Sequence, residues 1–385
     1  MSDDIPNIVQ NDFDIEIKKL RDQIDQIDEQ ILTLISKRFL EVQKVVTLKK
    51  KHNMPVFHPA REEDLISKLR SEAQQRDMDP DFIEELYRVI LRNSRIHQTV
   101  EMKQQGVRVG AKVLIVGGFG QMGSYFAWFF TTSGYEVRIL SENNWDKVES
   151  LCTDIDLVLI SVPIHVTLET IQRIAPYLPK EALLADLTSI KTAPLNEMLK
   201  VHKGPVLGLH PLFGPTCPTL DKQIIAITQG REPEKCQWLI DQLILWGAIV
   251  VSSTAKEHDE IMDIVQALRH FATFCFGQFL SKREIGLHRT LEFSSPIYRL
   301  EMGMVGRLFA QDSSLYSEIV FATPSRRKLL KDFVLSLNEQ LDMLENNDKE
   351  LFVEKFNETA KWFGSFSEQA LRESTFIINK LIERF

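Results

Sequence analysis

The 385-residue sequence has no apolar run approaching the roughly 18 residues that a membrane-spanning helix requires. Its N-terminus carries Asp3 and Asp4 where a secretory signal would place basic and then apolar residues. Acidic side chains outnumber basic ones, 54 against 46, and the net charge of −8 opposes general binding to nucleic acid, whose phosphates need a basic face. These absences predict a cytoplasmic protein that binds neither membranes nor nucleic acid.

Cysteine is also scarce. Four are present, none of them in a C-x-x-C pair: Cys152, Cys217, Cys236 and Cys275. In a reducing compartment, thiols this far apart are expected to be small buried side chains rather than disulfide partners or metal ligands. We therefore expect no metal site.

Glycine is absent before Gly106 and proline is rare in the same stretch, which favours long helices. After a short glycine-containing joint, brief β-branched runs alternate with helical stretches, the pattern of a parallel α/β sheet. From Glu257 the pattern is helical again. The sequence thus predicts a multidomain chain, with an all-α domain at 1–105, an α/β domain at 111–256 and an all-α domain at 257–385.

The first predicted helix is too long for the domain that contains it. Apolar residues recur at three- and four-residue spacing, at Ile17, Leu20, Ile24, Ile27, Ile31 and Leu34. A helix continuing to Lys51 would span more than about 50 Å and could not bury this stripe within one small domain, so we expect an intertwined homodimer. Two shorter helices are expected after Pro59 and Pro80, since proline is favoured at the first helical position.

Charged and polar side chains interrupt the apolar faces of these helices. Arg38 and Lys49 fall on the apolar face of the first helix, and Ser94 and Gln98 continue that of the third. Two cations on an apolar face are costly unless an anion meets them. The pattern fits either a site for an anionic ligand or a wet end of the bundle where long side chains reach solvent. Arg21 points about 100° away from Arg38 and could join such a site only from a second subunit.

This block resembles the all-helical chorismate mutase family. The residues that carry the resemblance are Leu20–Asp25, Lys37, Arg38, Lys49, Arg61–Glu63, Ser94 and Gln98. It implies that Arg38 of one subunit and Arg21 of the other hold the two carboxylates of chorismate. Lys49 and Gln98 would bond the ether oxygen of the breaking C–O bond. Glu62 would accept a hydrogen bond from the substrate hydroxyl, and Ser94 and Arg61 would support the site. His58 stands where some family members have aspartate.

The reaction of that family suits these residue types. The rearrangement of chorismate to prephenate is concerted and needs no nucleophile. Positioning of the substrate and preorganised hydrogen-bond donors are therefore the available means of catalysis. An arginine fork also matches a carboxylate better than lysine does.

A glycine-rich motif follows the first predicted strand of the α/β block. The strand is Lys112–Val116. The glycine-rich motif consists of Gly118, Phe119, Gly120, Gln121, Met122 and Gly123. A helix and a second strand at 136–140 come next, so the G-x-G-x-x-G pattern has the flanks of a dinucleotide-binding Rossmann-type domain. An acidic residue usually ends the second strand and favours NAD over NADP. Here Ser141 stands there with Glu142 beside it, and we expect NAD.

Three further strands are predicted at 157–163, 183–187 and 206–209. Ligands of such sheets lie at the carboxyl ends of the strands, which here carry Ser161, Thr188–Lys191 and His210. His210 precedes a Pro-x-x-Gly-Pro turn and is expected to face the crevice; a purely structural histidine is the alternative.

These segments resemble prephenate dehydrogenase. The motifs are Ser161–His165, Asp186–Lys191, Gly208–Pro215, Gln266–Phe271 and Ser294–Glu301. The resemblance implies that His210 takes the proton of the substrate's ring hydroxyl while NAD accepts the hydride and carbon dioxide leaves, giving 4-hydroxyphenylpyruvate. Lys191 and Ser161 would lie beside the substrate, and Val162 and Pro163 beside the cofactor.

Arginines in the C-terminal helices complete the predicted site. Arg307 follows Gly303 by one helical turn and lies beside Gly306, so its side chain leans over a place without side chains. Such a vacancy admits a ligand carboxylate or lets helices pack closely. In the resemblance Arg307 anchors prephenate, with Arg299 and Arg269 nearby. His270 matches a position linked to feedback by tyrosine. The apolar helices of this block resemble the dimer core of these dehydrogenases.

The order of the two resemblances, mutase first, is that of the bifunctional chorismate mutase/prephenate dehydrogenases of tyrosine biosynthesis. We therefore expect both activities in one homodimeric chain. Two alternatives remain open from the sequence. One is a monofunctional dehydrogenase whose helical N-terminus is a dimerisation arm, and the other is a nucleotide-sensing protein without turnover.

Overall fold

The computed structural model describes residues 6–52, 59–102, 106–217 and 219–382. His58 lies outside these residues. The chain divides into two compact units. The first comprises Met1–Val158, Pro211–Ile225 and Glu232–Val251, and the second comprises Leu159–His210, Ala226–Arg231 and Ser252–Phe385. The domain boundaries 105 and 256 expected from the sequence stay a prediction.

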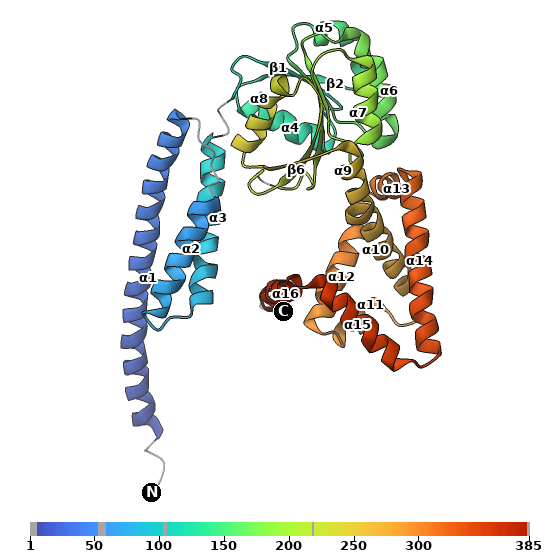
Figure 1. Cartoon of the computed structure of the whole chain (residues 1–385). Coiled ribbons are helices and arrows are strands. Elements are labelled where there is room, and N and C mark those ends of the chain that lie inside the picture. Colours follow the sequence, from blue (N-terminus) through green and yellow to red (C-terminus); the bar gives the residue numbers. More distant parts are fainter. Residues whose placement is uncertain (1–5, 53–58, 103–105, 218, 383–385) are drawn as a thin grey trace. The chain divides into compact units, whose positions relative to one another are not determined.

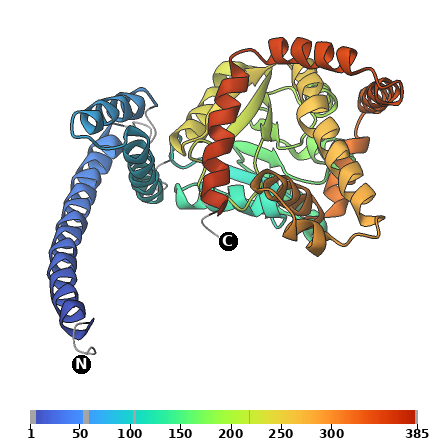
Figure 2. The same cartoon turned by 90° about the horizontal axis from the view of Figure 1, so that it is seen from below.

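The N-terminal part consists of the three expected helices, α1 (Pro6–Lys51), α2 (Pro59–Gln74) and α3 (Pro80–Met102). Each of the two shorter ones begins at the predicted proline. α3 packs against both α1 and α2, whereas the N-terminal half of α1 extends beyond them in both views (Figures 1 and 2). The apolar stripe along α1 is exposed within one chain, with Leu20 at 56% and Leu34 at 64%.

A seven-stranded sheet forms the centre of the chain, in the order β2-β1-β3-β4-β5-β6-β7. The strands are β1 (Lys112–Val116), β2 (Glu136–Leu140), β3 (Leu157–Ile160), β4 (Leu183–Asp186), β5 (Val206–Pro211), β6 (Ile224–Arg231) and β7 (Ile249–Ser253). β1 pairs with β2, and β4 with β5, in parallel register. The Rossmann-type prediction is confirmed, although the sequence did not predict β6 and β7.

Helices follow most of the strands. They are α4 (Gln121–Thr132), η1 (Glu142–Lys147), α5 (Val148–Cys152), α6 (Ile164–Ile174), η2 (Ala175–Tyr177), α7 (Thr192–Val201) and α8 (Pro233–Leu245). The residues of β1, β3 and β4 are almost all fully buried, which explains their continuous apolar sequences. This arrangement sends the strand ends, with their polar residues, toward the loops that precede the helices.

The C-terminal part is helical, as expected. Its elements are α9 (Ala255–Met262), η3 (Asp263–Leu268), α10 (Arg269–Ser281), α11 (Leu287–Glu292), α12 (Pro296–Phe309), α13 (Ser313–Phe321), α14 (Pro324–Glu345), α15 (Lys349–Phe363) and α16 (Phe366–Ile382). α9, η3 and α10 follow one another directly, and η3 is a π-helical turn. Its Asp263 pairs with the buried Arg326 of α14 at 2.8 Å. Across the described residues, every helix is too short or too polar to cross a bilayer.

Candidate active sites

The three N-terminal helices bring together two of the polar residues predicted on their apolar faces. The Arg38 guanidinium on α1 donates to the Ser94 hydroxyl on α3 at 2.8 Å, and that hydroxyl donates to the Ile90 carbonyl at 2.9 Å. Gln98 lies one turn further along α3 and is buried. Its side-chain oxygen has no hydrogen-bond partner among the described residues. A buried oxygen without a partner is costly, so this end of the bundle is suited to a polar ligand.

Lys49 and Glu62 form the second half of this cluster. Burial lowers the pKa of Lys49, and the nearby Glu62 carboxylate opposes that shift. Glu62 itself accepts from Arg95 at 2.6 Å, and Arg95 also donates to Asp221 at 2.6 Å. Arg95 was not among the predicted site residues, because nothing in the helical spacing distinguishes it from a solvated arginine.

Two predicted mutase residues lie elsewhere in the single chain. Arg21 is exposed on the part of α1 that extends beyond α2 and α3, and Arg61 is exposed at the start of α2. The role of Arg21 in a site of a second subunit stays a prediction. The role of Arg61 stays a prediction.

The glycine motif has the tight geometry that nucleotide binding requires. A Cβ on Gly123 would lie 2.4 Å from the Gly117 carbonyl oxygen, and one on Gly118 would lie 2.8 Å from Ile139. Gly117 has φ +82°, a conformation that favours glycine. Gly120 caps α4 without a side chain, so the first N–H groups of α4 are open to a phosphate.

The other predicted cofactor residues surround similar turns. Phe119 is 74% exposed, and Gln121 and Met122 begin α4. Ser141 caps η1: its backbone N–H donates to the Asn144 side chain at 2.7 Å, and its hydroxyl lies 3.2 Å from the same oxygen. The carboxylate of Glu142, which is exposed, follows directly. In the second unit, Val162 and Pro163 lie between β3 and α6, with Pro163 as the cap of α6.

The second unit builds a buried hydrogen-bonded chain around His210. His210 lies in β5 and is only 3% exposed. Its Nδ1 is 2.9 Å from Nε2 of His258 on α9, and Nδ1 of His258 is 2.9 Å from a carboxylate oxygen of Asp259. On the other side of the ring, the Gln266 amide nitrogen on η3 is 3.2 Å from His210 Nε2. The two ring nitrogens therefore have different partners.

The electrostatics keep the His210 imidazole neutral. Burial lowers the pKa of His210 well below its usual value, and nearby groups that carry or take up positive charge, His258, Lys191 and Arg326, lower it further. Asp259 opposes the shift only weakly. A neutral imidazole at physiological pH is what a general base needs.

Lys191 has no exposed surface. Its ammonium donates to the Asp186 carboxylate and, at 2.7 Å, to the Leu209 carbonyl, so it fixes β4 to β5 next to His210. Ser161 is half-buried at the end of β3. Sequence reasoning placed Lys191 and Ser161 beside the substrate, and both placements stay predictions.

The arginines on the C-terminal helices differ in their surroundings. Arg307 is exposed on α12, and a Cβ built on Gly303 or Gly306 would meet no atom of the chain within 4 Å. Within one chain these glycines therefore leave open space rather than a close helix contact. Arg299 donates to the Leu291 carbonyl at 2.7 Å, and Arg269 lies 3.3 Å from the His270 ring.

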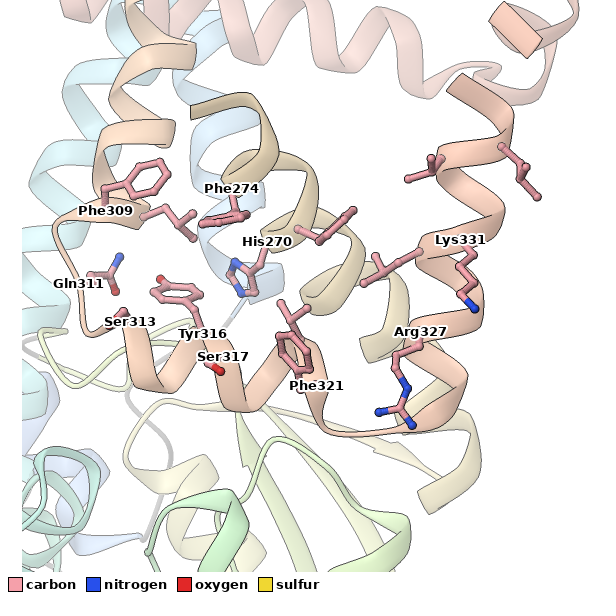
Figure 3. Close-up of a pocket in the computed structure, with 16 residues that line it drawn as sticks. His270, Phe274, Phe309, Gln311, Ser313, Tyr316, Ser317, Phe321, Arg327 and Lys331 are labelled. Atoms are coloured by element: carbon pink, nitrogen blue, oxygen red, sulfur yellow. The ribbon is translucent and has the colours of Figure 1, made fainter. Parts of the chain in front are cut away.

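His270 lines an apolar cavity of about 870 Å³ formed by α10, α12, α13 and α14 (Figure 3). Its ring packs edge-on against the Tyr316 ring, with 4.6 Å between the two ring centroids. Phe274 and Phe309 lie around the same cavity. Burial, together with Arg269 and Arg326, lowers the pKa of His270 to about 4. Its buried Nδ1 has no partner within the described part of the chain.

Sequence reasoning missed His258, Asp259 and Arg326. The capping residues Thr254 and Glu257 predict the start of α9 and could have placed His258 on its first turn. Nothing local shows that this turn lies against the end of β5, since the two are far apart in the sequence.

Known families match three successive parts of the chain. They are chorismate mutase type II at residues 20–99, the nucleotide-binding domain of prephenate dehydrogenase at 133–239 and the prephenate dehydrogenase dimerization domain at 254–358. The chain is 42% identical to the T-protein of Haemophilus influenzae over 362 residues, covering 93% of this chain and 95% of that protein. It is likewise 42% identical to the T-protein of Enterobacter agglomerans over 359 residues, covering 93% and 96%.

Solved structures share the dehydrogenase fold. Prephenate dehydrogenase from Aquifex aeolicus, in complex with hydroxyphenyl propionate and NAD+, matches with a TM-score of 0.54 at 20% identity. The match covers 66% of this chain and 97% of that one. Synechocystis arogenate dehydrogenase matches with a TM-score of 0.52 at 17% identity, covering 67% and 99%.

The family matches, on the helical and Rossmann-type folds described above, define a chorismate mutase joined to a prephenate dehydrogenase in one chain. The chain belongs to the T-protein family. It is therefore an enzyme of tyrosine biosynthesis with both an isomerase and an oxidoreductase activity, and the matches favour this bifunctional assignment over a dehydrogenase with a helical arm.

Proposed function

We propose that chorismate rearranges at the cluster formed by Arg38, Ser94, Gln98, Lys49 and Glu62. The observation that supports this site is the buried end of α3, where the side-chain oxygen of Gln98 has no partner among the described residues and lies close to the Arg38–Ser94 pair. Arg38 offers a fork to one substrate carboxylate, and Ser94 fixes the direction of that fork. Lys49 and the Gln98 amide donate toward the ether oxygen, where negative charge develops as the C–O bond breaks.

Prephenate is then oxidised at His210. The neutral imidazole accepts the proton of the ring hydroxyl as the hydride leaves the carbon that bears it. Loss of the ring carboxylate as carbon dioxide restores aromaticity and makes the step effectively irreversible. As the resemblance to the dehydrogenases implies, Arg307, Arg299 and Arg269 would anchor the substrate carboxylates, and the open space at Gly303 and Gly306 supports this role for Arg307.

The glycine cradle fits a dinucleotide cofactor, because a side chain at Gly123 or Gly118 would collide with the backbone or with Ile139. We assign NAD to this site, where it accepts the hydride. Gly118–Gly123 would hold the pyrophosphate at the α4 N-terminus. The exposed Glu142 carboxylate would accept from the ribose and repel a 2′-phosphate, while Val162 and Pro163 would line the nicotinamide side.

Three further properties belong to the same proposal. The exposed stripe on α1 supports a homodimer in which Arg21 of the partner subunit completes each mutase site. The apolar cavity at His270, whose ring Nδ1 has no partner in the described part of the chain, is suited to the phenol ring of tyrosine as a feedback inhibitor. The four free cysteines suit the reducing cytoplasm.

The test follows absorbance of NADH with prephenate and then with chorismate alone. NADH formation from chorismate without added mutase would demonstrate both reactions in one chain. A His210→Asn variant is expected to lose about 100-fold or more of the dehydrogenase rate while the mutase rate is unchanged. A His210→Asn variant as active as the parent would contradict the assignment of His210.

A further inference from the structure

A chain of hydrogen bonds runs from Asp259 through His258 to the ring of His210. The Asp259 carboxylate is fixed in place by the backbone N–H groups of Lys191 and Thr192, at 2.7 and 2.9 Å. Burial alone would raise the pKa of Asp259, but hydrogen bonds from His258, Thr192 and Lys191 lower it to about 2. Asp259 is therefore an anion that only accepts hydrogen bonds.

This anion determines which nitrogens carry protons. Asp259 accepts from His258, so His258 Nδ1 carries a proton. In the neutral His258 ring, Nε2 is then an acceptor, and it lies 2.9 Å from His210 Nδ1. His210 must donate there, which leaves the lone pair of a neutral His210 ring on Nε2. The Gln266 amide nitrogen lies 3.2 Å from that Nε2.

We infer that His258 and Asp259 are positioning residues that hold His210 in the tautomer with a bare Nε2. This inference rests on the proposed role of His210 as the base. A general base needs its lone pair directed at the substrate hydroxyl, and the opposite tautomer would present an N–H there instead. When the proton of the substrate hydroxyl reaches His210 Nε2, the ring becomes an imidazolium, and its Nδ1–H still donates to His258.

The groups that face His210 come from several elements. Lys191 precedes α7, His258 and Asp259 lie on α9, and Arg326 lies on α14. Among these groups, in the part of the chain that the structure describes, the Asp259–His258 pair is the one that is hydrogen-bonded to a ring nitrogen of His210. Lys191 and Arg326 lower the pKa of His210 but do not determine which of its ring nitrogens carries the proton.

Two substitutions of His258 separate this role from simple packing. In His258→Gln, the amide oxygen reaches the position of Nε2 and accepts from His210 Nδ1, so most of kcat is retained. In His258→Leu, the acceptor is lost, and kcat is expected to fall by about 100-fold or more while KM for NAD and the mutase rate are unchanged. Equal activity of the two variants, whether high or low, would overturn the inference.

A spectroscopic measurement reads the tautomer of His210 in the parent enzyme. With 15N-labelled histidine at about pH 8, where imidazoles are neutral, the His210 signals should show a protonated Nδ1 and a bare Nε2. His210→Asn identifies those signals by their loss. A protonated Nε2 in the parent would overturn the inference. If His210→Asn is inactive while the His258 variants match the parent, only this inference fails; if His210→Asn is active, the proposed function fails.

Discussion

Single polar residues on apolar faces carry much of the functional information in this sequence. Arg38 and Ser94 belong to different helices, yet the interruption of two apolar stripes predicts a shared site, and the side chains are hydrogen-bonded at 2.8 Å. Within the described part of the chain Arg38 forms no salt bridge, in contrast to Arg95, which is paired with Glu62 and Asp221. A guanidinium held by a neutral hydroxyl keeps its charge available for a substrate carboxylate.

We therefore expect Arg38→Ala to lower kcat/KM of the mutase by about 100-fold or more, since a charge-assisted hydrogen bond to the substrate is lost. The kcat/KM of Arg38→Lys should lie between those of Arg38→Ala and the parent, because lysine keeps the charge but lacks the forked guanidinium. The rates are measured with chorismate, and the dehydrogenase rate with prephenate serves as the control. A full mutase rate in Arg38→Ala would remove this residue from the mechanism.

Gly123 gives a second prediction for a single residue. In Gly123→Ala the new Cβ lies 2.4 Å from the Gly117 carbonyl, so the turn must move and the cradle for the pyrophosphate is disturbed. KM for NAD is expected to rise at least about tenfold, with no change in the mutase rate. Gly286→Ala is the matched control, since its Cβ would meet no atom within 4 Å. Similar KM values for the two variants would argue against the cradle.

At the scale of elements, local sequence patterns predict the helix or strand that ten or twenty residues form. They fail to predict contacts between elements that are far apart in the sequence. The helices beginning at Pro59 and Pro80 and the strands β1 and β2 follow from proline placement and apolar runs. The His210–His258 contact joins β5 to α9 and has no local signal. The π turn at Asp263 also depends on tertiary structure, because its carboxylate pairs with Arg326 of α14.

The pH dependence of the dehydrogenase tests the environment that β5, α9 and α14 create. The base works in its neutral form, and its pKa is lowered by burial and by His258, Lys191 and Arg326, opposed by Asp259. The kcat/KM with prephenate should thus stay on its plateau as the pH falls through about 6.5, the usual histidine value, and decline only well below it. An acid limb centred at or above 6.5 would contradict the assignment.

His270 on α10 makes a prediction about stability rather than rate. Its pKa is about 4 in the folded protein, against about 6.5 in the unfolded chain, so the unfolded chain binds more protons between these values. Stability is therefore lost as the pH falls through that window, by at most about 3 kcal/mol. In His270→Phe the drop in Tm between about pH 7.5 and about pH 5 should be smaller than in the parent. An equal drop would show that His270 is not responsible.

For the whole molecule, the exposed stripe on α1 connects composition to assembly. A long helix without glycine predicts a face that one domain cannot bury, and the structure leaves Ile24, Ile27 and Ile31 about half exposed within one chain. Exposed apolar area of this extent marks an interface. The mutase and dehydrogenase halves would respond differently to its loss, because in the proposed function the mutase site takes Arg21 from a second subunit and the dehydrogenase site does not.

The last prediction uses this difference. Ile24→Asp places a charge on the stripe, and Thr33→Asp places one on the opposite face, about 180° from Ile24 around the helix. Ile24→Asp should weaken the dimer through α1 and lower the mutase rate by about 100-fold, because burying an unpaired carboxylate is costly. The prephenate dehydrogenase rate should persist, since the cradle and His210 lie outside α1. Ultracentrifugation measures the dimer, the two assays measure the mutase and dehydrogenase rates, and Thr33→Asp is the control for each measurement. An unchanged mutase rate together with a weakened α1 contact in Ile24→Asp would mean that Arg21 serves its own chain.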